Sequence, residues 1–133
     1  MENKTILVVD DELDMRIFVS TVLETNGFKP IAVENGNQAL KKVRSTRPAL
    51  VILDLMMPKI EDGIQTYQQF KTDARLSHIP IIMLSAIARK MFFHTLKMLS
   101  PQKGAPIPEP EAYMEKPPEA NELIRLIKML LKS

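Results

Sequence analysis

Cysteine is absent from this chain of 133 residues, and its absence excludes several kinds of chemistry. Disulfides, thiolate nucleophiles and cysteine-ligated metals are ruled out, and a protein without disulfides suits a reducing compartment, so we expect it in the cytoplasm. An excess of one charge is also lacking, because 18 basic and 16 acidic side chains leave a net charge of +2. This balance favours neither nucleic acid nor an anionic membrane as a direct partner. No apolar run approaches the roughly 20 residues of a membrane-spanning helix.

The chain instead contains five short apolar runs separated by segments of helical periodicity. The runs cover residues 6–9, 30–33, 50–53, 79–84 and 112–115. The first, third and fourth runs lack apolar-polar alternation, so they are predicted to be strands buried on both faces. Strands that alternate with helices predict one α/β domain over residues 1–133, in which helices cover both faces of a parallel sheet as a three-layer sandwich.

The predicted helices are marked by their ends and by apolar residues at helical spacing. Asn26 and Gly27 are expected to end the first helix, Asn35 to cap the second, and Arg47 with Pro48 to end the second. The spaced apolar residues are Met15, Phe18, Val19 and Val22, then Ala39, Leu40 and Val43, then Ile64, Tyr67 and Phe70, then Phe92, Leu96 and Leu99, and finally Leu123, Ile124, Ile127, Leu130 and Leu131. The basic residues Lys41, Lys42, Arg44 and Arg47 are interpreted as the solvent face of the second helix.

A proline-rich segment interrupts this alternation before the last strand. It holds Pro101, Gly104, Pro106, Pro108 and Pro110. Proline cannot continue a helix and favours extended or turn conformations. We therefore predict an inserted surface loop at residues 100–112 and no domain boundary.

Polar side chains stand at the ends of four of the predicted strands. Asp10 and Asp11 follow the first run, Asp54 the third, Ser85 the fourth and Lys116 the fifth. Sites in open parallel sheets form beyond the carboxyl ends of the strands, so these five side chains are predicted to meet at one edge. Two carboxylates about 4 Å apart repel by roughly 4 kcal/mol at an effective dielectric constant of about 20. A divalent cation with oxygen ligands and the Lys116 ammonium are the candidates to offset that repulsion.

This set of groups matches what transfer of a phosphoryl group to a carboxylate requires. The aspartate is the nucleophile, the metal and lysine neutralise charge, and a hydroxyl can donate a hydrogen bond to the new phosphoryl oxygen. Each residue alone has a simpler interpretation. Asp10 and Asp11 could cap a helix, Asp54 could be a turn residue, and Lys116 could be a solvated surface charge. The ordered combination is what favours phosphoryl transfer.

The sequence also resembles the receiver domains of two-component response regulators. The matching segments, spread over nearly the whole chain, are residues 8–12, 52–58, 62–63, 79–86 and 113–117. The resemblance implies a flavodoxin-like sheet of order 2-1-3-4-5. Two departures are visible: one extra residue between Pro58 and Gly63, and several between Ser85 and Lys116, which we assign to the inserted loop.

The resemblance implies a phosphoacceptor and a metal site. Asp54 resembles the phosphoacceptor of a Mg²⁺-dependent (or Mn²⁺-dependent) reaction. Asp11 and Asp54 resemble direct metal ligands, Asp10 a ligand that acts mainly through water, and the backbone carbonyl of Met56 the third protein ligand. Because Met56 and Ile87 would flank the phosphoryl group and neither can orient water, we expect slow autodephosphorylation.

The resemblance further implies a switch. Ser85 resembles the switch hydroxyl, Lys116 the phosphate-binding lysine, and Tyr113 the aromatic residue whose ring moves inward on activation. The bond between Lys116 and Pro117 resembles the family's cis peptide. In this interpretation the protein assists its own phosphorylation and slow dephosphorylation without being an enzyme.

The implied partners are a sensor histidine kinase or histidine phosphotransfer protein and a downstream protein target. Dimerisation would be weak or phosphorylation-dependent. Because the last helix ends near residue 131, we expect a stand-alone receiver. One alternative is a docking module of receiver fold that does not use phosphate, although no expected acid, hydroxyl or lysine is missing. The other is an aspartate-nucleophile phosphatase. Phosphatases of that kind look like they need a second acid two residues after the nucleophile, and this chain has Met56 at that position.

Overall fold

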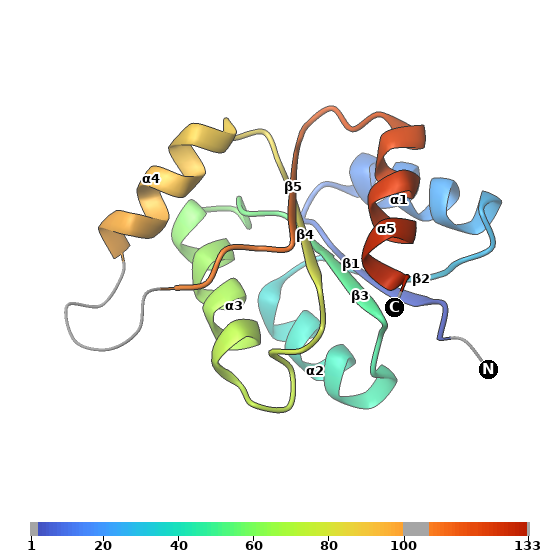
Figure 1. The fold of residues 1–133 in the computed structure, drawn as a ribbon, viewed down its shortest axis with the longest axis horizontal. Coiled ribbons are helices and arrows are strands. Elements are labelled where there is room, and N and C mark those ends of the chain that lie inside the picture. The colour runs from blue at the N-terminus through green and yellow to red at the C-terminus, as the bar shows by residue number, and fades with distance from the viewer. Residues whose placement is uncertain (1–2, 100–106, 133) are drawn as a thin grey trace.

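The computed structural model describes residues 3–99 and 107–132. Its strands are β1 (Thr5–Val9), β2 (Lys29–Val33), β3 (Leu50–Leu53), β4 (Ile81–Ser85) and β5 (Ala112–Glu115). Its helices are α1 (Leu13–Thr25), α2 (Gly36–Thr46), α3 (Ile60–Thr72), α4 (Arg89–Leu99) and α5 (Ala120–Leu131), as Figure 1 shows. The strands are all parallel, in the order β2-β1-β3-β4-β5. The predicted doubly wound, flavodoxin-like sheet is therefore confirmed.

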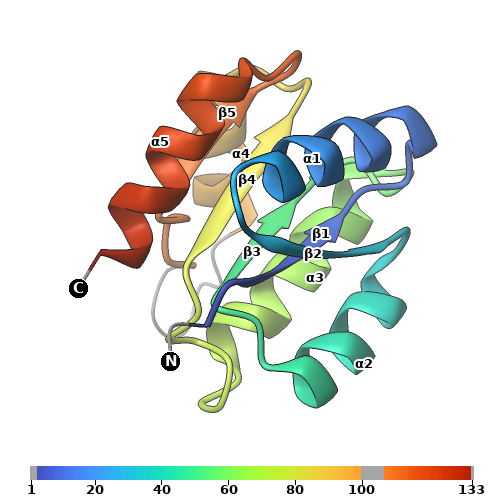
Figure 2. The ribbon, with the colours of Figure 1, turned by 90° about the vertical axis from the view of Figure 1, so that its right-hand side faces the viewer.

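Helices cover the sheet on both faces. Figure 2 shows α1 and α5 on one face and α2 and α3 on the other. Successive strand residues point to opposite faces, so Val51 and Ile81 pack with α2, α3 and α4, while Ile52 and Ile82 pack with α1 and α5. β3 and β4 are buried along their whole length, as their continuous apolar runs predicted. The two cores fix the strands whose ends carry the polar groups.

The predicted ends of the first two helices are confirmed. The backbone N–H groups of Asn26 and Gly27 close α1, and Gly27 has a φ of 85°, in the left-handed region that favours glycine. The Asn35 side chain accepts a hydrogen bond from the backbone of Gln38 and caps α2. Arg47 ends α2 in a left-handed conformation. Across the described ranges, none of the helices is both long and apolar enough to cross a bilayer.

Two details of the predicted elements are wrong. Ile79 and Pro80 lie before β4, because the Ile79 N–H donates to the Leu76 carbonyl in a turn, and Ser85 is the last residue of the strand instead of the residue after it. Phe18 does not belong to the buried stripe of α1. Its side chain is 40% exposed, and the buried residues of that helix are Val19 and Leu23.

Part of the predicted loop, residues 100–106, lies outside the described residues. The segment 107–111 packs along α3 and against the start of β4. The Tyr67 hydroxyl donates to the Pro108 carbonyl, and the Lys71 ammonium lies 2.7 Å from a Glu111 carboxylate oxygen. The same oxygen accepts from the Ile81 N–H at 2.7 Å. Ala112 is the first residue of β5, as the predicted strand over residues 112–115 has it.

Candidate functional site

The carboxyl ends of neighbouring strands bring the predicted site residues to one edge of the sheet. Asp10 follows β1, Asp54 follows β3, Ser85 ends β4 and Lys116 follows β5. Hydrogen bonds of the sheet continue through this edge, from the Asp54 N–H to the Val9 carbonyl at 2.9 Å and from the Lys116 N–H to the Ser85 carbonyl at 2.8 Å. The backbone that carries these side chains is therefore fixed by the sheet itself.

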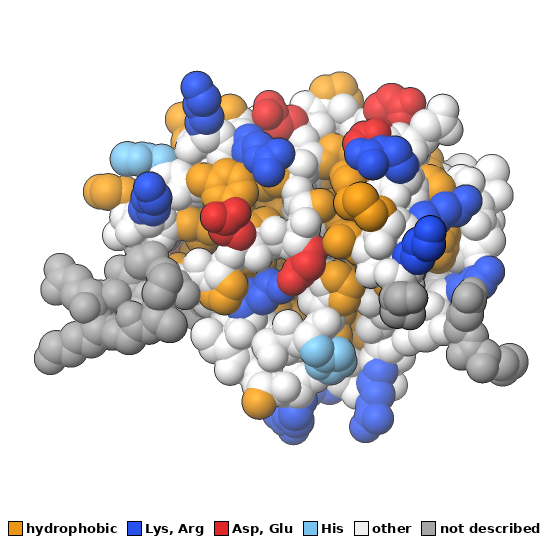
Figure 3. Space-filling view, viewed as in Figure 1, with side chains coloured by type: hydrophobic (Ala, Val, Ile, Leu, Met, Phe, Trp, Pro, Cys, Tyr) orange, Lys and Arg blue, Asp and Glu red, His pale blue; other side chains and the backbone are white. Residues whose placement is uncertain are grey.

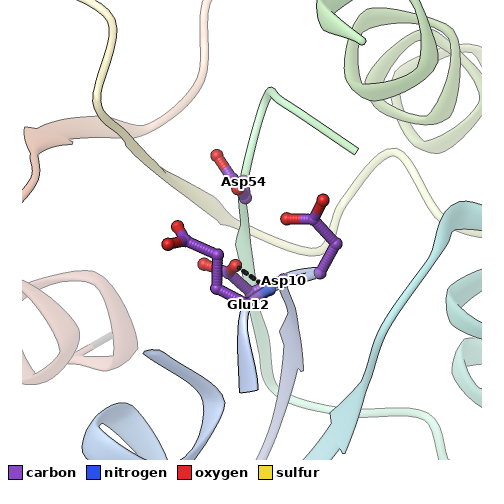
Figure 4. Close-up of side chains that lie close together, drawn as sticks. Asp10, Glu12 and Asp54 are labelled. Atoms are coloured by element: carbon purple, nitrogen blue, oxygen red, sulfur yellow. Dashed lines mark hydrogen bonds between the residues drawn. The ribbon is translucent and has the colours of Figure 1, made fainter. Parts of the chain in front are cut away.

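The Lys116 ammonium lies among three carboxylates. Its Nζ is 2.9 Å from Asp10 Oδ2, 2.7 Å from Glu12 Oε1 and 3.2 Å from Asp54 Oδ2. The other oxygen of each aspartate accepts a backbone hydrogen bond, Asp10 Oδ1 from Glu12 at 2.9 Å and Asp54 Oδ1 from Met56 at 3.2 Å. Figure 4 shows Asp10, Glu12 and Asp54 gathered at the end of the sheet, with the bond from Glu12 to Asp10 dashed. The lysine offsets part of their mutual repulsion.

Burial disfavours the charged forms of the two aspartates at this edge, and Lys116 compensates for it only in part. Asp10 and Asp54 are each only 2% exposed. Burial, followed by the charge of Asp10, raises the pKa of Asp54 to about 6, against the lowering effect of Lys116. Burial also raises the pKa of Asp10. Burial alone would lower the pKa of Lys116, but Glu12, Asp10 and Asp54 together raise it above its usual range. The site therefore holds carboxylates that gain from a further cation.

Four acidic side chains at this edge form a donor set for a hard cation. Asp10, Asp11, Glu12 and Asp54 each offer an oxygen, and these oxygens lie within 4.8 Å of one another. Among the described residues, Asp11 makes no ion pair and is exposed to solvent. Carboxylate oxygens with room for water are the ligands that magnesium prefers. The side chains present therefore fit a divalent metal. Met56, the predicted backbone ligand, lies in the loop after Asp54 with its side chain 39% exposed.

Ser85 and Tyr113 form a second group beside the carboxylates. Ser85 is fully buried, and its Oγ accepts from the Ile87 N–H at 3.2 Å. The Tyr113 hydroxyl donates to the Ile87 carbonyl, and its ring stacks on Phe92 with centroids 4.9 Å apart. Burial raises the pKa of Tyr113 to about 12, against a smaller lowering effect of the nearby Ser85. The tyrosine is thus packed inward in this structure.

The ion pair between Glu12 and Lys116 was not predicted. Glu12 belongs to segment 8–12, which resembles receiver domains, but no function was predicted for it from the sequence. Glu12 and Lys116 are 104 positions apart in the chain. Glu12 occupies the cap position of α1, and its side chain makes no capping hydrogen bond. A glutamate that follows two aspartates at a strand end was the only signal in the sequence, and local patterns do not reveal partners at such separation.

The loop after Asp54 is compact. Both the Met57–Pro58 and the Lys116–Pro117 peptide bonds are cis, and the second confirms a prediction. Gly63 lies in the first turns of α3 against the Leu55 carbonyl, and a Cβ atom there would come within 1.7 Å of that oxygen. Only glycine allows α3 to approach the loop so closely.

Parallel strands in this order, with acids, a serine and a lysine at their carboxyl edge, define a class of signalling domain. The family model of the response regulator receiver domain matches residues 6–128, and the chain belongs to this family. Its members are signalling domains of two-component systems, generally not catalytic enzymes, that interact with histidine kinases and downstream targets.

Similar proteins agree with this assignment. The chain is 32% identical over 131 residues to the polar-differentiation response regulator DivK of Brucella anthropi, covering 98% of both chains. It is 35% identical over 130 residues to the alkaline phosphatase synthesis transcriptional regulatory protein PhoP of Bacillus subtilis, covering 98% of this chain and 49% of that protein. The receiver domain of the Francisella response regulator 1452 superposes with a TM-score of 0.78 at 27% identity, covering 98% of both chains.

Proposed function

We propose that this chain is a phosphoacceptor that takes a phosphoryl group on Asp54. The donor would be a phosphohistidine of a sensor histidine kinase or histidine phosphotransfer protein, and the output a changed surface for a downstream protein target. The observation that carries the proposal is a buried Asp54 carboxylate held 3.2 Å from Lys116 beside a cluster of acids. We further propose that it acts as a single receiver domain in the cytoplasm and that it dimerises weakly or on phosphorylation.

The acidic cluster supports dependence on Mg²⁺ or Mn²⁺. Asp10, Asp11, Asp54 and the backbone carbonyl of Met56 would hold the ion. When bound, the ion would neutralise charge on the transferred phosphoryl oxygens. Mutual proximity of the acidic oxygens and the burial of two of these acids are the observations that favour such an ion.

The chain's own residues supply the remaining chemistry. An Asp54 oxygen forms a bond to phosphorus as the phosphorus–nitrogen bond of the donor breaks, and the imidazole leaves with the electron pair and a proton from water. Lys116, already paired with Asp54, stabilises the negative charge of the transferred group. Positioning of these groups accelerates the transfer, so the protein assists its own phosphorylation.

Ser85 and Tyr113 are proposed to convert the new charge into a new surface. The Ser85 oxygen already accepts a backbone hydrogen bond, so its proton can be donated to a phosphoryl oxygen. Ser85 and Tyr113 both bond to the backbone of Ile87, so a shift of Ser85 toward the phosphoryl group would alter how the tyrosine packs on Phe92. The change would reach α4 and β5, which carry Phe92 and Tyr113.

Mass spectrometry after incubation with acetyl phosphate and MgCl₂ tests the proposal. The wild type is expected to gain one phosphoryl group, and Asp54→Asn to gain none. Asp14→Asn removes an exposed acid of α1 outside the cluster and serves as the matched control. An unmodified wild type, or an equally modified Asp54→Asn variant, would show that another residue or no residue accepts phosphate.

The two alternatives have less support. A docking module that ignores phosphate has no need for a lysine and two buried aspartates in contact, and burying them is costly. A phosphatase would need an acid or base near the attacking water, and the residue two positions after Asp54 is the apolar Met56. Sustained turnover of a phosphate ester would favour that reaction instead.

A further inference from the structure

A cavity of about 750 Å³ opens at the edge of the sheet opposite the acidic cluster. It lies where the end of α2 meets the connections that lead into β3 and β4. Ala49, which lines it, directly precedes β3, whereas Asp54 directly follows that strand. At about 3.3 Å per residue, these two residues are roughly 17 Å apart along the strand. The cavity is therefore separate from the phosphoacceptor site.

Apolar side chains form the floor of this cavity and basic ones its rim. The floor includes the buried residues Val43, Pro48, Leu76 and Ile79. The rim consists of the exposed side chains Arg44, Arg47, Arg75 and His78. A pocket of several hundred Å³ with an apolar lining and a few polar groups is typical of a small-molecule site.

Among the described residues that line the cavity, none carries a carboxylate. Within the part of the chain that the structure describes, the guanidinium groups of Arg44 and Arg47 make no hydrogen bond or ion pair. Arg75 pairs with Asp73 at 3.4 Å, and the charge of Asp73 also acts on Arg44, so the charges of both arginines are partly offset. Figure 3 shows blue and pale-blue side chains, and no red ones, along the lower edge of that view, where Figure 1 shows α2 and the connection between α3 and β4. The rim therefore favours an anion.

The backbone around the cavity is held in place by hydrogen bonds. The Asn3 side chain donates to the Arg47 carbonyl at 2.8 Å, and the Arg47 N–H donates to Val43 at 3.1 Å. On the opposite side, the Leu76 N–H donates to the Asp73 carbonyl at 2.9 Å. These bonds fix both walls before any ligand arrives, which lowers the entropic cost of binding.

We propose that this cavity binds a small organic phosphate of the nucleotide class. Arg44 and Arg47 would receive the phosphate, since guanidinium groups match phosphate oxygens in charge and geometry. The ring would cover the floor around Pro48 and Leu76. Inorganic phosphate alone would leave this apolar floor in water. A peptide added as a strand would need an unpaired strand edge, whereas β3 is paired with both β1 and β4.

Amide chemical shifts of the isotope-labelled protein test the proposal, with AMP, ATP and inorganic phosphate as separate probes in EDTA. AMP and ATP are expected to shift the amides of residues 43–49 and 75–79, and inorganic phosphate to bind at least tenfold more weakly. Metal-free buffer separates this site from the acidic cluster, because a site without carboxylates needs no cation. Silent amides at millimolar AMP and ATP, or equal binding of inorganic phosphate, would overturn the proposal.

A matched pair of double variants distinguishes specific binding in the cavity from nonspecific attraction of an anion to basic residues. Arg44→Gln with Arg47→Gln is expected to weaken nucleotide binding at least tenfold. Lys41→Gln with Lys42→Gln removes the same charge from exposed positions of the same helix that do not line the cavity, and is expected to change binding less than twofold. Equal losses in both variants would refute the site. Both should still accept phosphate from acetyl phosphate, since neither touches Asp54.

Discussion

Asp54 carries a charge in a position where the fold disfavours it. The side chain is 2% exposed, and burial with the neighbouring charge of Asp10 raises its pKa from 3.8 to about 6. Lys116 reduces this cost without removing it. A carboxylate in such a position gains from a nearby cation, and the same cation would offset the added negative charge of a phosphoryl group.

The first prediction follows from this cost. Between pH 3.8 and about 6 the folded protein binds more protons at Asp54 than the unfolded chain, so the free energy of unfolding falls as the pH rises through that window. In EDTA at neutral pH, Asp54→Asn should therefore be more stable than the wild type, by up to about 3 kcal/mol. Urea denaturation across pH measures the difference, which should vanish below about pH 4. A variant less stable than the wild type at neutral pH would contradict it.

The second prediction concerns the lifetime of the phosphorylated form. Met56 follows Asp54 by two residues and Ile87 follows Ser85 by two, and neither side chain can orient an attacking water. The half-life in MgCl₂ is expected to be minutes to hours. Met56→Asn adds a group that can hold water and should shorten the half-life roughly tenfold, while leaving the backbone carbonyl in place. Loss of radiolabelled phosphate measures both rates, and Met98→Asn on exposed α4 is the control. A wild-type half-life of seconds would refute the argument.

At the scale of elements, the segment 107–111 is more firmly attached than a loop prediction implies. Lys71 is a lysine whose side chain is only 4% exposed, and Glu111 is its partner. Glu111 also accepts from the Ile81 N–H, so one carboxylate joins α3, β4 and the segment that leads into β5. The link holds β5, and therefore Tyr113 and Lys116, in register with β4.

Glu111→Ala tests that link. The change leaves a buried ammonium and a backbone N–H without their partner, so it should lower the free energy of unfolding by about 2–3 kcal/mol. Glu109→Ala, at an exposed position of the same segment, is the control and should have almost no effect. Urea denaturation compares the two variants. Equal stabilities would mean that Lys71 finds water or another partner when Glu111 is removed.

Local patterns predicted the elements well where one physical cause dominates. β3 occupies residues 50–53 as predicted. A strand inside a parallel sheet is covered on both faces, so four consecutive apolar residues are typical of it. Asn35 caps α2 because its short side chain reaches the Gln38 N–H. The start of β4 was misplaced because Ile79 is apolar for another reason: it closes the turn after α3 and is buried there.

At the scale of the whole molecule, the sheet topology predicted where the site lies. Contacts between residues far apart in the sequence could not be predicted. Parallel strands place Asp10, Asp54, Ser85 and Lys116 at one edge whatever lies between them. The pairs Glu12–Lys116 and Lys71–Glu111 join residues 104 and 40 positions apart, so no local pattern signals them. The net charge of +2 was equally uninformative, because it averages an acidic edge with a basic one.

From the acidic edge we expect the stability of the whole molecule to depend on divalent cations. A ligand that binds only the folded state stabilises it by RT ln(1 + [L]/Kd), or about 2.7 kcal/mol at a hundredfold excess over Kd. MgCl₂ should therefore raise the free energy of unfolding of the wild type beyond the effect of NaCl at equal ionic strength. Asp11→Asn should lose most of this gain at little cost to the fold, because Asp11 is exposed and makes no ion pair in the described part of the chain. Asp14→Asn should keep the gain. An Asp11→Asn variant stabilised as much as the wild type would place the cation elsewhere.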